Sequence, residues 1–277
     1  MNKLNREKQI EIVKCLVEGN SIRSASRITG TSRNTVSKLI LALGEACEKF
    51  HDENVKNVNS KRVECDEIWS YVGKKDANCT PAERGSGELG SVWTWTALDA
   101  DSKLIVSWLI GGRDGEYAYA FMSDVASRLA NRVQLTTDAH SVYLTAVRES
   151  FGDSGVDYAM LVKKYGKGEG SRPETRYSPA ICTGIEKQPK LGNPDSDLIS
   201  TSYVERQNLS MRMNMRRYTR LTNGFSKSIE HHIAAVAIYF MHYNFVRIHQ
   251  TLRVTPAMEA GLTKHLWEIG DLVDLMR

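Results

Sequence analysis

Three acidic residues lie where predicted strands and helices of this sequence begin or end. Asp66 falls within a strand-like run, Asp138 directly follows another, and Glu205 opens a helical segment rich in arginine. Carboxylates delivered from two strands and one helix can converge on a pair of divalent cations, which is how proteins position phosphoryl-transfer chemistry. The pattern therefore favours a fold in which these three side chains meet.

Each of these acids also has an ordinary structural interpretation. Asp66 could be a strand-edge charge, Asp138 a turn residue or helix cap, and Glu205 a partner of the helix dipole. Glu174 competes as the third acid, but it follows a proline in a stretch where no helix would hold it. We predict Asp66, Asp138 and Glu205 as the catalytic and metal-binding set. His140 either orients a phosphate or water near Asp138 or has a structural role.

The predicted metal is Mg²⁺, with Mn²⁺ able to substitute, because carboxylate oxygens suit hard divalent cations. Two such ions, about 3.5–4 Å apart, activate the attacking oxygen and stabilise the leaving one during displacement at phosphorus. Without metal, clustered carboxylates raise one another's pKa values by mutual repulsion. We therefore expect a site that is completed only when metal and DNA bind.

The chain after residue 60 predicts the order βββαβαβ followed by helices. Strands are expected at 62–72, 92–100, 104–109, 133–137 and 158–163, and the intervening helices at 116–131 and 143–150. That order is the plan of the ribonuclease-H-like fold, in which three antiparallel strands are extended by parallel strands reached through helical crossovers. The metal site of that fold uses the first and fourth strands, where Asp66 and Asp138 fall. We predict an α/β fold: a ribonuclease-H-like mixed sheet flanked by helices, with an N-terminal all-α helix-turn-helix domain.

The first 50 residues predict three helices with clear punctuation. The first ends at Gly19, the second spans 22–29, Gly30 supplies a turn, and Thr31 or Ser32 caps the third. In a helix-turn-helix the start of the third helix faces the major groove, whereas a three-helix cap on the rest of the chain is the structural alternative. The predicted base or phosphate contacts are Ser32, Arg33, Asn34, Ser37 and Lys38.

The net charge of +4 is too small to identify a DNA-binding protein, but its distribution is more informative. Residues 206–229 hold six Lys or Arg and no acid. Along the helix expected from 202 to 217, one face carries Glu205 with arginines and the opposite face is apolar, so the first should meet DNA and the second the core. A solvated basic face is the alternative. The predicted contacts are Arg206, Asn208, Arg212, Arg216 and Arg217, and the apolar face is Val204, Met211, Met215 and Tyr218.

Composition and punctuation suggest the domain plan. Residues 1–50 form the helix-turn-helix domain, 51–60 a linker, 61–262 the catalytic domain with an irregular insertion at 165–200, and 263–277 a helical tail. The chain is 41% hydrophobic and 25% charged, and no apolar run approaches the ~18 residues that span a bilayer. No secretory signal is visible, so we expect a cytoplasmic, nucleoid-associated protein. Five scattered cysteines predict neither disulfides nor a cysteine zinc site.

Several motifs resemble the insertion-sequence-one family of DDE transposases. They are DEIWSYVGKK at 66–75, TDAH at 137–140, YVERQNL at 203–209, FSKS at 225–228, and the run from Tyr243-Asn244 through Arg247, His249 and Leu252 to Thr255-Pro256-Ala257. The resemblance covers residues 61–262. Many family members also carry an amino-terminal zinc finger, and this sequence has no CxxC pair, so its recognition of terminal repeats is expected to differ.

This resemblance implies a DDE transposase that binds double-stranded DNA at element ends, nicks it and joins 3′-hydroxyl ends to target DNA, with Asp66, Asp138 and Glu205 as its triad. Handling two DNA ends leads us to expect a homodimer or larger synaptic complex. Two alternatives stay open. One is a nuclease of the same fold without strand transfer, and the other is a non-catalytic helix-turn-helix regulator.

Overall fold

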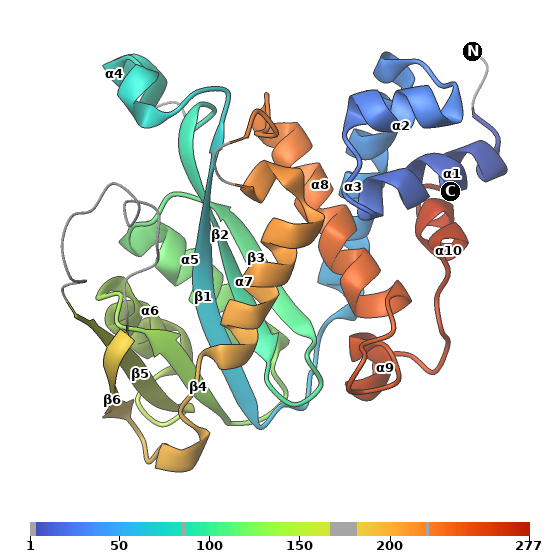
Figure 1. Ribbon diagram of the computed structural model, residues 1–277. Helices are drawn as coiled ribbons and strands as arrows, with labels where there is room; N and C mark the ends of the chain where they lie inside the picture. Colours follow the sequence, from blue (N-terminus) through green and yellow to red (C-terminus); the bar gives the residue numbers. More distant parts are fainter. Residues whose placement is uncertain (1–3, 85–86, 167–181, 220–221) are drawn as a thin grey trace.

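The computed structural model describes residues 4–84, 87–166, 182–219 and 222–277, and Figure 1 shows how its helices and strands are arranged. Glu174, and Arg220 of the basic segment, lie outside these residues. Among the residues described, none of the helices has both the length and the apolar character required to traverse a lipid bilayer.

Three helices open the chain, and they are α1 (Arg6–Val17), α2 (Ile22–Thr29) and α3 (Arg33–Asn54). Ser21 and Ser32 cap α2 and α3, because their side chains accept hydrogen bonds from the backbone N–H groups of Ser24 and Thr35. Gly30 adopts a left-handed conformation, with φ of 66°, which ends α2 and turns the chain toward α3. The turn between these two helices is therefore as the sequence predicted.

A six-stranded mixed sheet forms the centre of the molecule. Its strands are β1 (Arg62–Val72), β2 (Gly90–Asp99), β3 (Ile105–Gly111), β4 (Val133–Asp138), β5 (Val156–Tyr165) and β6 (Cys182–Leu191). Their order is β3-β2-β1-β4-β5-β6, with β1, β2 and β3 antiparallel, and β4 and β5 parallel to β1. This order and these directions are those of the ribonuclease-H-like fold, so the predicted fold class is confirmed.

Helices cover both faces of this sheet (Figure 1). On one face lie the crossover helices α5 (Gly115–Arg128) and α6 (Val142–Phe151), and on the other α7 (Ser202–Asn214) and α8 (Ile229–Met241). Successive residues of β1 alternate between the two faces, so Cys65 packs with Phe121 and Tyr143, whereas Ile68 packs with Met211 and Phe240. The apolar face predicted for the basic helix, Val204, Met211, Met215 and Tyr218, is buried.

The remaining elements are short. They are a 3₁₀ turn (Asp76–Asn78), α4 (Pro81–Arg84), 3₁₀ turns at Ser196–Leu198 and Arg216–Tyr218, a π-helical extension of α8 (His242–Val246), α9 (Pro256–Glu259) and α10 (Ile269–Asp274). The predicted helical tail at 263–277 thus contains α10, which lies beside α1. Arg6 and Asp274 join these two helices by an ion pair of 2.8 Å.

The first helices pack tightly on the last ones. Gly44 of α3 lies so close to α8 that a Cβ atom there would sit 2.4 Å from the Cα of Ala234. Ser37 of α3 also shares a hydrogen bond of 2.6 Å with His231 of α8. One apolar cluster joins α1, α2 and α3 to α8 and α10. Residues 1–50 therefore share a hydrophobic core with the end of the chain. That they form a separate helix-turn-helix domain stays a prediction.

Two details differ from the sequence prediction. The insertion at 165–200 was expected to be irregular, but Cys182–Leu191 forms β6, paired with β5. Pro189 suggested a break, yet a proline is tolerated on an edge strand, where its missing N–H leaves no partner unsatisfied. The helix expected to run to residue 217 ends at Asn214, because Met215 is extended, with φ of −124° and ψ of 102°.

Gly44→Ala should destabilise the protein by about 1–3 kcal/mol, since the added methyl group overpacks the crossing of α3 and α8. Gly115→Ala is the matched control, because a Cβ atom there meets nothing within 4 Å. Urea unfolding measures both variants. Equal stability of the two would contradict the close crossing.

Candidate active site

The parallel pairing of β1 and β4 brings two of the predicted acids together. The strands are in register up to Cys65 and Thr137, so Asp66 and Asp138 are the next residues along each. One carboxylate oxygen from each of Asp66, Glu67 and Asp138 lies within 4.8 Å of the others. The structure therefore forms an acidic cluster, defined here as these three residues, where β4 ends.

Placing these three carboxylates together is electrostatically unfavourable. Burial, and then the charge of Asp138, raise the pKa of Asp66 to about 6 and the pKa of Glu67 to about 7. Within the described residues, Glu67 Oε1 is buried and makes no hydrogen bond of ordinary geometry, although the buried Tyr143 hydroxyl lies close enough to lower the pKa of Glu67 somewhat. A buried carboxylate oxygen without a donor is unfavourable unless a cation or a proton neutralises it. Additional positive charge, from a proton or a cation, would therefore stabilise the cluster.

Glu67 was not among the predicted site residues. It directly follows Asp66 in the sequence, and alternation along β1 directs it to the opposite face of the sheet, toward α6. The available signal was its position in a strand with apolar residues on both faces, because an acid there must be buried. An acid buried in that way needs a partner.

Arg113, in the loop after β3, is that partner. Its Nε donates to Glu67 Oε2 at 3.0 Å, and its terminal nitrogen lies 3.7 Å from Asp138 Oδ2. Asp138 is also held by the backbone N–H of His140, which donates to its Oδ1 at 2.9 Å. The His140 ring in turn accepts from the N–H of Val142 at 3.4 Å, so its contacts in the structure are structural ones.

Glu205 approaches the cluster from the other face. Its carboxylate forms an ion pair with Lys163 of β5 and accepts a hydrogen bond from the Thr201 hydroxyl. Its charge contributes to the raised pKa of Asp66, so the two carboxylates are electrostatic neighbours. Glu205 does not belong to the group within 4.8 Å, and its carboxylate is paired with Lys163 instead.

Glu64 positions the helix that carries Glu205. Its buried carboxylate accepts hydrogen bonds from the backbone N–H groups of Tyr203 and Val204, at 2.8 and 3.0 Å. These are amide groups at the start of α7 that have no partner within the helix, and a negative charge there also complements the helix dipole. The pKa of Glu64 is nevertheless raised, with burial as the main cause. Glu64 was likewise missed by the sequence analysis.

These residues fit a divalent cation. Carboxylate oxygens are the ligands that Mg²⁺ and Mn²⁺ prefer, and the cluster combines several of them with the unpaired Glu67 Oε1. Asn208 of α7 fixes Asp66, since its side-chain amide donates to Asp66 Oδ2 at 2.9 Å and leaves Oδ1 to the neighbouring backbone N–H of Glu67. Asn208 is therefore buried at the cluster rather than exposed on a DNA-facing surface.

The other predicted DNA contacts are spread over two regions. At the start of α3 the side chains of Ser32, Arg33, Asn34 and Lys38 are exposed, and Ser37 is half-buried against His231. Arg206 and Arg216 are exposed and Arg212 is half-buried. The DNA-binding role of these residues stays a prediction.

Arg217 is half-buried, and its guanidinium is held by neighbouring segments of the chain. Its guanidinium donates to Ser226 Oγ at 3.0 Å and to the carbonyl of His231 at 2.7 Å. Burial lowers its pKa to about 10. These contacts tie the segment after α7 to the start of α8, so Arg217 has a structural role here, and its contact with DNA stays a prediction.

Replacing Glu64 tests how α7 is positioned. Glu64→Ala should lower stability by about 1–3 kcal/mol, because it leaves two amide groups of α7 without their acceptor. Glu64→Gln should lose less, since its amide oxygen can still accept. Urea unfolding of both variants measures the difference, and equal losses would show that the two hydrogen bonds are not what Glu64 contributes.

The raised pKa values predict how stability and metal binding depend on pH. Asp66 and Glu67 hold protons more tightly when folded, so their contribution to stability without metal should fall as pH rises from about 4 through 7. Metal must displace those protons. We expect Mn²⁺ to raise Tm more at pH 8 than at pH 5.5, measured by thermal unfolding in Mn²⁺ and in EDTA.

The control for that measurement is the double variant Asp66→Asn/Asp138→Asn. It should be more stable than the wild type in EDTA, because like charges are removed, and should lose the increase with Mn²⁺. An increase in Tm that is the same at both pH values, or that survives in the double variant, would place metal binding elsewhere.

Comparison with known proteins finds only distant structural likenesses. No protein-family model matches the chain, and no curated protein matches it. Among solved structures, it is similar to the Mos1 mariner paired-end complex with Mn (13% identity, TM-score 0.25, 57% of this chain and 60% of that one). It is also similar to the Mos1 strand transfer complex (11% identity, TM-score 0.25, 80% of this chain and 76% of that one). The chain thus spans about three-fifths of the first of these proteins, and the fold assignment rests on the strand order above.

Proposed function

We propose that this protein is a metal-dependent polynucleotidyl transferase of the DDE type that acts on DNA as a transposase. The observation that carries the proposal is the acidic cluster at the adjoining positions of β1 and β4, with Glu205 facing it from α7. Buried, mutually repelling carboxylates are costly to a fold, and they are characteristic of sites where cations and phosphates bind.

Divalent cations held by Asp66 and Asp138, together with Glu67 or Glu205, would supply charge neutralisation at phosphorus and activation of the attacking oxygen. The protein's own residues prepare that site. Asn208 orients Asp66, and the backbone N–H of His140 orients Asp138.

Two cations of the protein balance the acids. Arg113 neutralises Glu67 and lies near Asp138, and Lys163 neutralises Glu205. A metal bound to these carboxylates would neutralise them in place of Arg113 and Lys163. Each of the two side chains would then be available to contact a phosphate oxygen of the substrate. This exchange of partners is part of the proposal.

The DNA ends would be recognised by α2 and α3 acting as a helix-turn-helix, with contacts from exposed residues at the start of α3 such as Asn34 and Lys38. Water would attack first, and the freed 3′-hydroxyl would then attack target DNA. Because two ends are handled, we propose a homodimer or larger complex. The resemblance to the insertion-sequence-one family is the source of the element-end assignment.

A nuclease of the same fold is the second candidate, since every residue of the acidic cluster would serve hydrolysis equally. It differs from the transposase in one product: DNA strands are cut but never joined to a second duplex. A non-catalytic regulator would bind DNA through the amino-terminal helices alone.

The test is a gel assay of labelled DNA carrying the gene's own flanking ends, with a second duplex as target and with Mg²⁺ or Mn²⁺. Wild-type protein should give joined products, and Asp66→Asn, Asp138→Asn and Glu205→Gln should each lower the rate by at least about a hundredfold. Asp153→Asn is the matched control, because that carboxylate is 87% exposed beyond α6.

The products separate the candidates. Cutting without joining would favour the nuclease, and DNA binding with no metal-dependent product would favour the regulator. Full activity of the Asp138→Asn variant would contradict both enzymatic proposals.

A further inference from the structure

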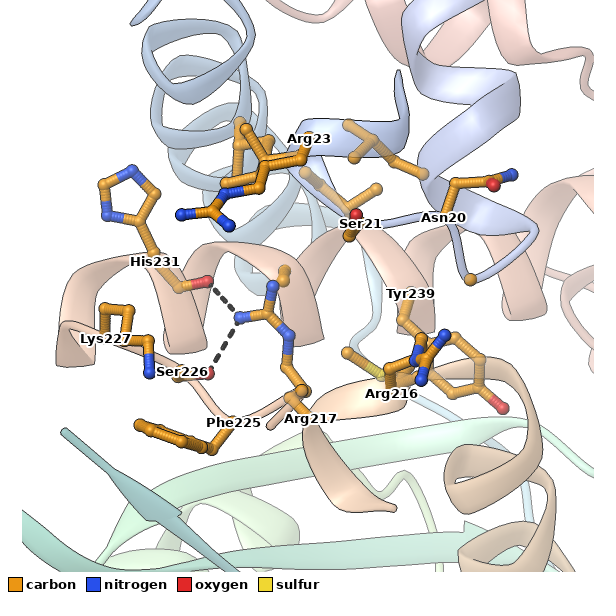
Figure 2. A pocket seen from close by; sticks show the side chains of 18 of the residues that line it. Asn20, Ser21, Arg23, Arg216, Arg217, Phe225, Ser226, Lys227, His231 and Tyr239 are labelled. Atoms are coloured by element: carbon orange, nitrogen blue, oxygen red, sulfur yellow. Dashed lines mark hydrogen bonds between the residues drawn. The ribbon is translucent and has the colours of Figure 1, made fainter. Parts of the chain in front are cut away.

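A large cleft lies between the amino-terminal helices and the segment that joins α7 to α8. Its volume is about 940 Å³, and it is bordered by the start of α2 and α3 on one side and by residues from 214–217 and 223–239 on the other (Figure 2). A volume near the top of the usual range for ligand pockets, about 300–1,000 Å³, suits a short stretch of one nucleic-acid strand rather than the full width of a duplex. The acidic cluster does not contribute to it.

The lining of this cleft carries one sign of charge. Among the residues that the structure describes, five Lys or Arg side chains line it, namely Arg23, Arg33, Arg216, Arg217 and Lys227, and no Asp or Glu does. A smaller pocket beside it is lined by Arg23, Ser26, Arg27 and Arg33. Clefts lined by cations alone focus a field that attracts polyanions.

Three of these cations are unpaired. Across the part of the chain that the structure describes, Arg23, Arg33 and Arg216 make neither a hydrogen bond nor an ion pair through their side chains. Arg217 differs, since its guanidinium is used by Ser226 and His231. The free arginines come from both sides of the cleft, as Figure 2 shows for Arg23 and Arg216.

Aromatic side chains accompany the charges. Phe225 lines the cleft, stacks on Tyr71 of β1 at 4.7 Å, and lies under the ammonium group of Lys227 at 3.1 Å. Tyr239 borders the cleft but is buried, and its hydroxyl accepts a hydrogen bond from Gln207 at 3.4 Å. Because Tyr71 and Lys227 cover the Phe225 ring, these aromatic side chains form the wall of the cleft, and the groups that the cleft would hold are the phosphates of a strand.

The two sides of the cleft are fixed relative to each other. Gly44 and Ala234 pack α3 directly on α8, and the hydrogen bond from Ser37 to His231 lies at the edge of the cleft itself. The arginines therefore do not need to be brought together when a ligand binds. A preformed site loses less entropy on binding.

We propose that this cleft binds the phosphates of a single DNA strand, with Arg23 and Arg33 contacting it from the helical side and Arg216 and Lys227 from the opposite side. It is a second DNA site, distinct from the acidic cluster, and it joins residues that sequence reasoning had assigned to two separate surfaces. The inference rests on the proposed function only for the choice of DNA as the polyanion.

The test measures binding without catalysis. Fluorescence anisotropy of a labelled single-stranded DNA of about 20 nucleotides, a length beyond one binding site, is recorded with the full chain in EDTA over a series of NaCl concentrations. Arg23→Gln and Arg216→Gln should each weaken binding several-fold and reduce the slope of log K against log salt by about 0.7. Arg216→Lys should restore most of that slope, because a phosphate accepts either cation.

Arg148→Gln is the control, since it removes the same charge from an exposed position on α6, on the far face of the sheet. It should leave the slope unchanged, and thermal unfolding should show all four variants to be folded. Unchanged binding in Arg23→Gln and Arg216→Gln would overturn the proposal, and so would an equal loss in Arg148→Gln. Tighter binding of the RNA of the same sequence, or an effect confined to duplex DNA, would overturn the choice of a single DNA strand.

Failure of this proposal and failure of the proposed function are distinguishable. Binding in EDTA does not depend on the acidic cluster, so Asp66→Asn/Asp138→Asn should bind the strand at least as tightly as the wild type. If the protein cuts DNA but its strand binding does not depend on Arg23 or Arg216, the proposed function stands and the proposed cleft site is wrong.

Discussion

The parallel pairing of β1 with β4 is the constraint on which the rest of the site depends. It aligns residues 66 and 138, which are 72 positions apart in the chain, on neighbouring strands. Parallel neighbours cannot be joined by a tight turn, so the chain must cross over the sheet, and α5 makes that crossing. The crossover buries one face of the sheet, and the acids are placed at the boundary of the buried region. Their charge then has to be compensated locally.

Each carboxylate near this boundary is compensated by a different kind of partner. Glu64 uses the free amide groups of α7, Glu67 uses Arg113, Glu205 uses Lys163, and Asp66 uses an amide side chain and a backbone N–H. The compensation is incomplete, since burial and mutual repulsion still raise the pKa of Asp66 and of Glu67. A stable fold that retains such a cluster holds binding capacity for cations, because removing the acids would stabilise it.

The close contact of α3 with α8 links this site to the amino-terminal helices. Because Gly44 has no side chain, the two helices approach until their backbones nearly touch, and one apolar cluster then extends from α1 to α10. The start of α3 is thereby fixed opposite the segment after α7. The cationic cleft is a consequence of that arrangement, and its arginines would be far apart if residues 1–50 were a freely tethered domain.

Much of the fold was determined by local pattern. Apolar periodicity and the caps Ser21, Ser32 and Gly30 fixed the helices near the amino terminus, and strand alternation fixed β1 to its ends at Arg62 and Val72. Order alone then limited the topology, because parallel strands require helical crossovers. Strand β6 was missed because a proline disrupts a central strand but is tolerated in an edge strand. Which strand lies at an edge is known only once the whole sheet has formed.

The sequence by itself determined which acids could meet, since Asp66 and Asp138 belong to the strands that this topology makes neighbours. The tertiary structure alone decided their partners. These partners depend on side-chain direction across the sheet and on contacts between distant segments. Glu67 pairs with Arg113, Glu64 accepts from the start of α7, and Asn208 donates to Asp66. The tertiary structure also engaged the guanidinium of Arg217 with Ser226 and His231 while leaving Arg216 exposed. The physical reason is that periodicity encodes burial along one element, whereas the pairing of charges depends on distances between elements, which are set only when the whole core packs.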